Sequence, residues 1–309
     1  MRDGRQYLYM YISVIAMVVA APMYFYPIFL MKVMCFALFA MAFNLLMGYG
    51  GLLSLGHAAF FGTGAYVSAY LSSRYGANPE ISILIGTLAA TAMGAVFGAL
   101  AVRRHGIYLA MVTLGLSQLV YFFALRSPFT GAEDGIQGVK RGSLFGVISL
   151  RDDMTFYWVI ATVFLLLSFF IYRLVYSQFG MTVRAVRDNE KRAISLGISP
   201  FKVKLMLFTV SAAISGIAGS MKALVFQIAS LADLHIATSG EVVLMTLIGG
   251  VGTIAGPAIG ALIVVIMQNY LAFLGQWVVF FQGAIFVVAV LAFRQGIVGV
   301  FAKLLGRPL

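Results

Sequence analysis

Charged residues are scarce in this chain, and their scarcity excludes a water-soluble fold. Only 10% of the 309 residues are Asp, Glu, Lys or Arg, whereas soluble domains contain about 25%. Hydrophobic residues make up 62% of the chain, and the mean hydropathy is +0.99. The composition predicts an all-α membrane protein, because a helix satisfies its backbone hydrogen bonds internally within the bilayer.

Cysteine and nucleotide-binding or catalytic motifs are also lacking. The single Cys35 lies within an apolar run, which excludes an intrachain disulfide and a cluster of thiolate metal ligands. The three histidines are far apart, and no set of nucleophile, base and acid is recognisable. The G-x-x-x-x-G-K-[ST] phosphate-binding pattern is missing. The chain is therefore predicted to have no catalytic residues, no metal site and no ATPase site of its own.

What the chain does contain is a series of apolar runs, most of them near the roughly 20 residues that a helix needs to cross a bilayer. The eighth run is short and ends in glycine, so a broken or re-entrant segment is expected there. The first run has no clean cleavage site and is expected to be retained as a span. The pattern predicts one polytopic domain over 1–309, with about 8–10 transmembrane helices, and it allows an internal repeat. The runs lie near residues 7–26, 28–48, 54–72, 81–102, 107–125, 155–175, 205–228, 237–250, 255–274 and 277–293.

The distribution of Lys and Arg predicts the orientation of these spans. Fourteen of the 21 basic residues fall in loops on one side and five in loops on the other. Loops rich in Lys and Arg remain in the cytoplasm. Both termini and the loop 176–204 are therefore predicted to be cytoplasmic. The loop 126–154, in which acidic and basic residues nearly balance, is predicted to be external.

The predicted cytoplasmic loop has the pattern of a short helix. Asp188 or Asn189 can cap its N-terminus, Glu190 lies in the first turn, and Gly197 with Pro200 ends it. Such a helix, too small to bury its own apolar side, suits docking into a groove on a soluble partner. The alternative is a basic loop that only sets the topology.

The same helix has an apolar stripe and a charged side. Residues at helical spacing form the stripe, which is expected to supply the buried area of a docking contact. The charged residues are expected to face solvent or the partner. The stripe contains Val186, Asn189, Ala193 and Leu196, and the charged side contains Arg187, Glu190, Lys191 and Arg192.

Two apolar stretches are unusually rich in glycine, one in each half of the chain. The first contains Gly50-Gly51-x-x-Ser54, and the second contains Gly249-Gly250-x-x-Thr253. Paired glycine-interrupted segments in the two halves are typical of the translocation site in repeat-built transporters. Close packing of helices alone is the alternative explanation. The candidate path residues in these stretches are Gly50, Gly51, Ser54, His57, Gly249, Gly250 and Thr253. For His57, a hydrogen-bonded structural role is the simpler explanation.

A third stretch, residues 106–115, is followed by Ser117 and Gln118 and places neutral polar groups in an otherwise apolar helix. Thr113 is the member that we include among the candidate path residues. Such groups can line a path for a zwitterion without trapping it. Hydrogen bonding between helices is the simpler explanation for each residue taken singly.

Together these motifs resemble the permeases of branched-chain amino-acid importers, the LivM/LivH family, and the LivM branch most closely. The similarity extends from about Asn44 to Phe293. The strings that support it are NLLMGYGGLLSLGHAAF from Asn44, GIYLAMVTL from Gly106, RAVRDNE from Arg184 and IGGVGTIAGP from Ile248. Urea and short-amide permeases share these strings, so they do not identify the solute.

The resemblance implies a multi-pass subunit of the bacterial inner membrane that binds no cofactor itself. Its partners would be a second permease in a heterodimer, two cytoplasmic ATPase subunits that use ATP, and a periplasmic solute-binding protein. The segment 176–204 would then be the coupling loop. The residues that we assign to ATPase coupling are Arg184, Arg187, Asp188, Glu190, Ala193, Leu196 and Gly197.

Two other transporter classes are alternatives to an ATP-driven importer. An ion-coupled secondary transporter normally keeps paired carboxylates or a basic residue within the membrane. Here Asp233 and Glu241 are expected at a membrane edge, and Lys32 and Lys222 near enough to span ends to extend to the interface. A channel has no need of a cytoplasmic docking helix.

Overall fold

The computed structural model of the protein describes residues 15–144, 146, 148–277, 280, 283–284, 287, 296–297 and 299. Residues 1–14 at the N-terminal end and 300–309 at the C-terminal end lie outside the described residues. Most of the expected span 277–293 also lies outside them. The prediction that both termini are cytoplasmic concerns these undescribed ends.

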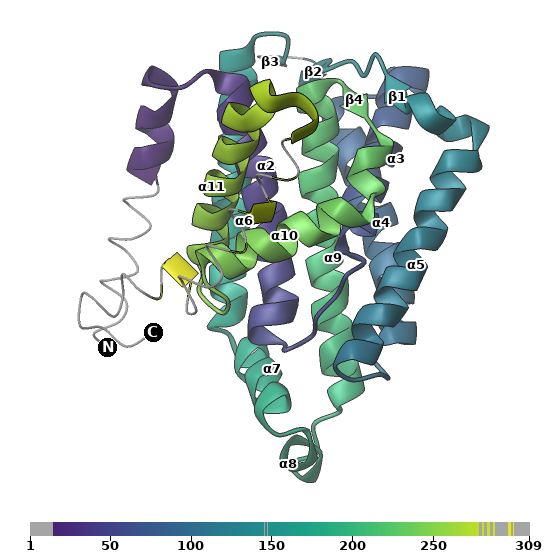
Figure 1. Ribbon diagram of the computed structural model, residues 1–309, viewed down its shortest axis with the longest axis vertical. Coiled ribbons are helices and arrows are strands. Elements are labelled where there is room, and N and C mark those ends of the chain that lie inside the picture. The colour runs from purple at the N-terminus through teal and green to yellow at the C-terminus, as the bar shows by residue number, and fades with distance from the viewer. Residues whose placement is uncertain are drawn as a thin grey trace.

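The described chain is a bundle of long helices, as the composition predicts (Figure 1). Five helices are long and apolar enough to cross a membrane. At 1.5 Å per residue, 20 residues already extend about 30 Å, the thickness of the hydrocarbon core. The five are α2 (Pro27–Asn44, continued by the π-helical turn Leu45–Tyr49), α4 (Pro79–Ala101), α5 (Ile107–Arg126), α6 (Asp153–Val175) and α9 (Pro200–Phe226).

Three further helices, α3 (His57–Tyr75), α10 (Ile236–Gly249) and α11 (Gly256–Leu271), follow or flank the two glycine-rich stretches. α10 has 14 residues, about 21 Å in length, which is too short to cross the bilayer. Figure 1 shows it lying obliquely across helices that run along the long axis. The expected broken segment near 237–250 is therefore present as a short, tilted helix.

α9 lies at the centre of the bundle and packs against α2, α3 and α4. Small residues allow this close approach: Gly64 contacts Gly216, and Gly94 contacts Ala212. The outer faces of α4 and α5 expose large apolar side chains, as a lipid-facing or subunit-facing surface does. These include Leu84, Leu88, Leu119 and Phe122.

The ends of α5, α6 and α9 opposite α7 and α8 bear a small cap of short strands and 3-10 turns. The strands are β1 (Ile136–Gln137), β2 (Ser143–Leu144), β3 (Ile148–Ser149) and β4 (Ile228–Ala229), and the turns are η3 (Pro128–Thr130), η4 (Ala132–Asp134) and η5 (Leu231–Leu234). Antiparallel pairs join β1 to β4 and β2 to β3. The whole length of α6 separates this cap from α7 (Gln178–Asp188) and α8 (Glu190–Ser195), which lie at the other end (Figure 1).

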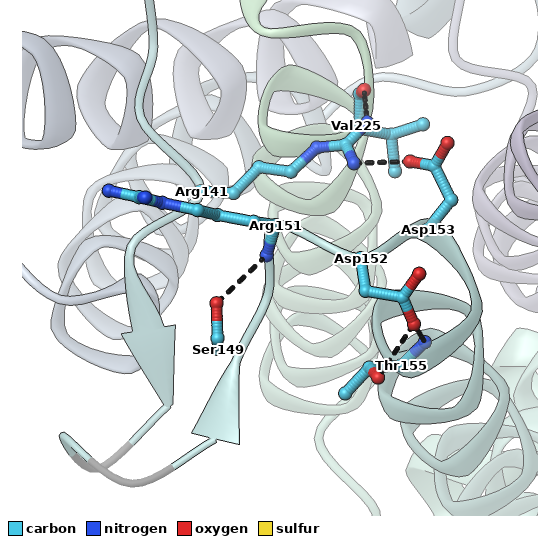
Figure 2. A network of polar contacts seen from close by, with 7 residues as sticks. All are labelled: Arg141, Ser149, Arg151, Asp152, Asp153, Thr155 and Val225. Atoms are coloured by element: carbon cyan, nitrogen blue, oxygen red, sulfur yellow. Dashed lines mark hydrogen bonds and ion pairs between the residues drawn. The ribbon is translucent and has the colours of Figure 1, made fainter.

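Figure 2 shows how the loop before α6 is held in the cap. Arg141 forms an ion pair with Asp153 and donates a hydrogen bond to the carbonyl of Val225, 3.0 Å away. The loop is thereby bound to the start of α6 and the end of α9. Asp152 caps α6, since its carboxylate accepts the backbone N–H of Thr155 at 3.0 Å. Donation from the Thr155 N–H and hydroxyl holds the pKa of the Asp152 carboxyl below its usual range.

Candidate functional site

The first glycine-rich stretch interrupts the chain between two helices. The π-helical turn ends where the N–H of Gly50 reaches the carbonyl of Leu45 at 3.1 Å. Gly51 then has a φ of +66°, which only glycine adopts readily. The chain continues without helix until α3 starts at His57. The side chain of Ser54, in this break, is fully buried.

Asn44 joins this break to the second glycine-rich stretch. Its side-chain amide donates to the carbonyl of Thr253 at 2.7 Å and accepts the N–H of Gly252 at 2.9 Å. Asn44 is only 2% exposed, so both bonds are made away from water and replace hydration that the backbone groups have lost. The end of α2, which leads into the first stretch, therefore contacts the second stretch, more than 200 residues away in the sequence.

Gly48 makes the contact close. A Cβ on Gly48 would lie 2.6 Å from the backbone N and 2.9 Å from the Cα of Gly252. Any larger residue would push the two stretches apart. We call Asn44, Gly48, Gly252 and Thr253 the glycine junction.

The third stretch packs against the same break. The hydroxyl of Thr113 in α5 accepts the N–H of Leu55 at 3.2 Å and donates to the carbonyl of Ala110 at 2.9 Å. The backbone of Gly56 touches the Thr113 carbonyl. Thr113 and Thr253 thus both contact the first stretch, at different positions.

The remaining path candidates stabilise their own local structure. Thr253 accepts the N–H of Gly256 at 3.1 Å and donates to the carbonyl of Gly250 at 2.8 Å, which closes the turn before α11. Gly249 packs against the backbone of Gly256. These contacts fit the simpler explanation, close packing, as well as they fit a path.

His57 is fully buried and hydrogen-bonded, which fits a structural role. Its Nε2 is 3.0 Å from the hydroxyl of Ser211 in α9. Its ring packs against Phe39, Phe43 and Phe60. Over the part of the chain that the structure describes, no three His, Cys, Asp or Glu residues are grouped to hold a metal ion.

The charged segment forms two helices instead of the single helix that the spacing predicts. α7 ends at Asp188, and the chain turns at Asn189, whose backbone is extended (φ −154°, ψ 94°). The Asn189 side chain accepts the N–H of Arg192 at 3.0 Å and caps α8. Glu190 lies in the first turn of α8, as the sequence predicts. Gly197, just after the end of α8, has a φ of +80°. We call α7 and α8 together the α7–α8 hairpin.

The continuous exposed stripe that the spacing predicts is not formed. Val186 and Ala193 are buried by the chain itself, at 3% and 2% exposure. Only Leu196 of the apolar members is open, at 74%, and Ile194 joins it at 56%. The turn at Asn189 rotates α8 relative to α7, so one helical period does not describe both. Of the predicted stripe, only the α8 end is accessible, and in α7 the exposed apolar residue Met181 (56%) lies outside the stripe.

Several charged residues that were assigned to ATPase coupling also bind the hairpin to the bundle, and two of them, Arg187 and Glu190, were expected to face outward. Arg184 donates to the carbonyl of Val175 at 3.1 Å. Glu190 pairs with Lys204 of α9 at 2.6 Å. Arg187, which pairs with its neighbour Asp188, makes a third contact, with the carbonyl of Gly48 in the glycine junction.

A buried ion pair lies near the opposite end of α9. The Nζ of Lys222 is 2.8 Å from a carboxylate oxygen of Asp233, and their side chains are only 12% and 7% exposed. Asp233 also accepts the N–H of Ser230 at 3.2 Å. The sequence placed these residues near membrane edges and did not pair them, because no short-range pattern relates residues on different elements.

Comparisons with known proteins agree with the resemblance seen in the motifs. A family model described as "Branched-chain amino acid transport system / permease component" matches residues 26–290. The high-affinity branched-chain amino acid transport permease LivM of Escherichia coli is 29% identical, over 85% of this chain and 68% of its own length. A probable LivM of Methanocaldococcus jannaschii is 25% identical over 74% and 72%. The fructose import permease FrcC of Rhizobium meliloti is 27% identical over 70% and 63%. No solved structure matches the chain significantly.

Proposed function

This chain belongs to the family of branched-chain amino acid transport permease components, and from that membership we propose that it is the membrane subunit of an ATP-driven importer. It would itself hydrolyse no ATP and bind no cofactor. The energy would come from two ATPase subunits that dock on the α7–α8 hairpin. A second permease and a solute-binding protein would complete the complex. The name of the E. coli relative favours branched-chain amino acids as the solute.

The observation that supports docking best is the shape and exposure of the α7–α8 hairpin. It extends beyond the membrane helices at one end of the bundle (Figure 1). Its tip exposes Ile194 and Leu196 beside Lys191 and Arg192, which are also exposed. Burying a leucine side chain contributes about 1.5–3 kcal/mol, whereas an exposed ion pair contributes about 1 kcal/mol or less. The apolar tip should therefore contribute more to docking than any single charge.

The hairpin is also attached firmly enough to act on the membrane helices. The bonds of Arg184 to Val175 and of Lys204 to Glu190 hold it to α6 and α9. A partner that displaces the tip would displace these helix ends with it. A segment that only set the topology would need charge but no such attachment.

The orientation follows the same proposal. The hairpin and its loop 176–204 would lie in the cytoplasm, the loop 126–154 in the cap would lie outside, and both termini would be cytoplasmic. The separation of hairpin and cap by the full length of α6 supports opposite sides for the two loops. The membrane would be the bacterial inner membrane.

An ion-coupled secondary transporter is the alternative, and the Lys222–Asp233 pair is the feature that favours it. Buried ionisable residues within the membrane often mark proton or ion pathways. This pair is already neutralised internally and hydrogen-bonded to Ser230, as a structural pair is. An ion-coupled secondary transporter therefore remains the second candidate, after the ATP-driven importer.

The test is to put a charge into the apolar tip. Leu196→Asp should lower ATPase co-purification and uptake together, while the protein still inserts, because an aspartate cannot occupy an apolar groove without a desolvation cost. Phe129→Asp, equally exposed but in the cap, should leave ATPase co-purification unchanged. Uptake into proteoliposomes should require ATP. Uptake driven by an ion gradient without ATP would favour the alternative.

A further inference from the structure

Arg187 connects the α7–α8 hairpin to the first glycine-rich break. One guanidinium nitrogen, Nη1, donates to the carbonyl of Gly48 at 2.8 Å. Gly48 lies in the π-helical turn that ends α2. The last carbonyls of a helix have no partner within it, and a cation there is favoured by the helix dipole. Arg187 thus caps a membrane helix from a residue 139 positions away.

The neighbouring Asp188 holds the guanidinium in this orientation. Its carboxylate oxygen accepts the Arg187 Nε–H at 3.0 Å and is 2.9 Å from Nη2. Two of the three guanidinium nitrogens therefore face one oxygen of Asp188, and the third reaches Gly48. A lysine has only a single ammonium group and cannot make all these contacts at once.

The contact continues from Gly48 into the second half of the chain. Asn44, one turn earlier in α2, binds Gly252 and Thr253 through both atoms of its amide. Gly48 itself lies against Gly252 with no room for a side chain between them. A Cβ on Gly51 would be 2.9 Å from the Cγ of Arg187, so the break packs directly on the arginine stem.

These bonds form one series from hairpin to junction. The hairpin contacts the π-turn through Arg187, the π-turn belongs to the same helix as Asn44, and Asn44 contacts the turn before α11. The contacts of Arg184 and Glu190 reach the ends of α6 and α9 and, at 3.8 Å from Glu190, His105 in the loop between α4 and α5, but neither reaches a glycine-rich break. Arg187 is thus the hairpin residue whose side chain reaches both the first break and, through it, the second.

We propose that Arg187 is a positioning residue that transmits movement of the α7–α8 hairpin to the glycine junction. Displacing α7 would pull on the Gly48 carbonyl through its hydrogen bond with Arg187 and shift the end of α2. Because Asn44 lies in the same helix, this shift would change how the two breaks contact each other. The inference rests on the proposed function, since it needs a partner that moves the hairpin. It reassigns Arg187 from a docking contact to a link within the chain.

The experiment measures solute taken up per ATP hydrolysed in proteoliposomes that contain the complete transport complex. Arg187→Ala should keep its ATPase subunits, because the apolar tip is intact, but lower this ratio by about threefold or more. Arg187→Lys should recover part of the loss, since one donor can still reach Gly48. Arg173→Ala, an exposed arginine in the last turn of α6, should keep the wild-type ratio.

Asn44→Ala supplies an independent variant further along the series. If both residues act in one series, the double variant Arg187→Ala with Asn44→Ala should lower the ratio by less than the product of the two single effects. A wild-type ratio in Arg187→Ala would overturn the proposal, and so would two effects that multiply fully. An Arg187→Ala protein that is merely less heat-stable, with an unchanged ratio, would also overturn it.

Failure of the proposed function gives a different result. It would appear in the wild-type protein, as uptake that does not depend on ATP, whatever the variants do. Failure of the Arg187 proposal alone would leave wild-type uptake ATP-dependent and only the variant ratio unchanged.

Discussion

Replacing Gly48 with alanine is the smallest change that tests the glycine junction. The added Cβ would lie 2.6 Å from the backbone N of Gly252, whereas ordinary contacts begin near 3.4 Å. The two backbones would have to separate by about 0.8 Å, the difference between these distances. The added Cβ would also press against the amide oxygen of Asn44.

The cost follows from these contacts. Overpacking by one carbon in a close-packed interior costs about 1–3 kcal/mol. Separating the stretches also lengthens the two hydrogen bonds of Asn44, each contributing about 0.5–1.5 kcal/mol. We expect Gly48→Ala to lower the free energy of unfolding by about 2–6 kcal/mol.

Gly115 offers a matched control. It lies within α5, and a Cβ there would meet no atom within 4 Å. Gly115→Ala should therefore stabilise the helix by about 0.5–1 kcal/mol, because alanine loses less backbone entropy than glycine. The two glycine-to-alanine changes are predicted to act in opposite directions.

The assay is thermal unfolding of the purified protein in detergent, followed by tryptophan fluorescence, together with uptake in proteoliposomes. Gly48→Ala should lower Tm by at least about 4 °C and reduce uptake, while Gly115→Ala should do neither. If Gly48→Ala melted at the wild-type temperature and transported normally, the two stretches would not be in the close contact described, and the reasoning would be refuted.

Two further predictions follow from the fold. Single cysteines at Ser143 and Ser195, in a Cys35→Ala background, should label oppositely with an impermeant thiol reagent in intact cells; equal labelling would contradict the proposed orientation. Lys222→Met should lower the free energy of unfolding by about 3–5 kcal/mol, because it leaves the Asp233 carboxylate buried and unpaired. Adding Asp233→Asn should recover part of that loss in the same thermal assay, and no recovery would show that the ion pair is not the cause.

Much of the fold could be predicted from the sequence because its determinants are local. Hydropathy over about 20 residues identifies membrane helices wherever they pack, so α2, α4, α5, α6 and α9 lie close to their expected positions. The N-terminal capping of α8 could be predicted for the same reason. Asn189 and Glu190 act within one turn of the residues that they stabilise.

The glycine junction was predictable only in part. The parallel spacing of Gly50-Gly51 and Gly249-Gly250 indicated that two breaks are related. It did not identify Asn44 as the residue that joins them. The available signal was a lone amide in an otherwise apolar helix, since a buried polar group must find a partner. The sequence does not show which backbone groups supply it.

The sequence by itself determined that this protein is a helical membrane permease with two glycine-rich breaks and a charged segment with helix-capping residues. Tertiary structure decided that Ala193 faces inward, that Lys222 pairs with Asp233, and that Arg187 reaches Gly48. The division has a physical cause. Hydropathy and helix capping act between residues a few positions apart, whereas these contacts join separate elements and depend on how the helices pack.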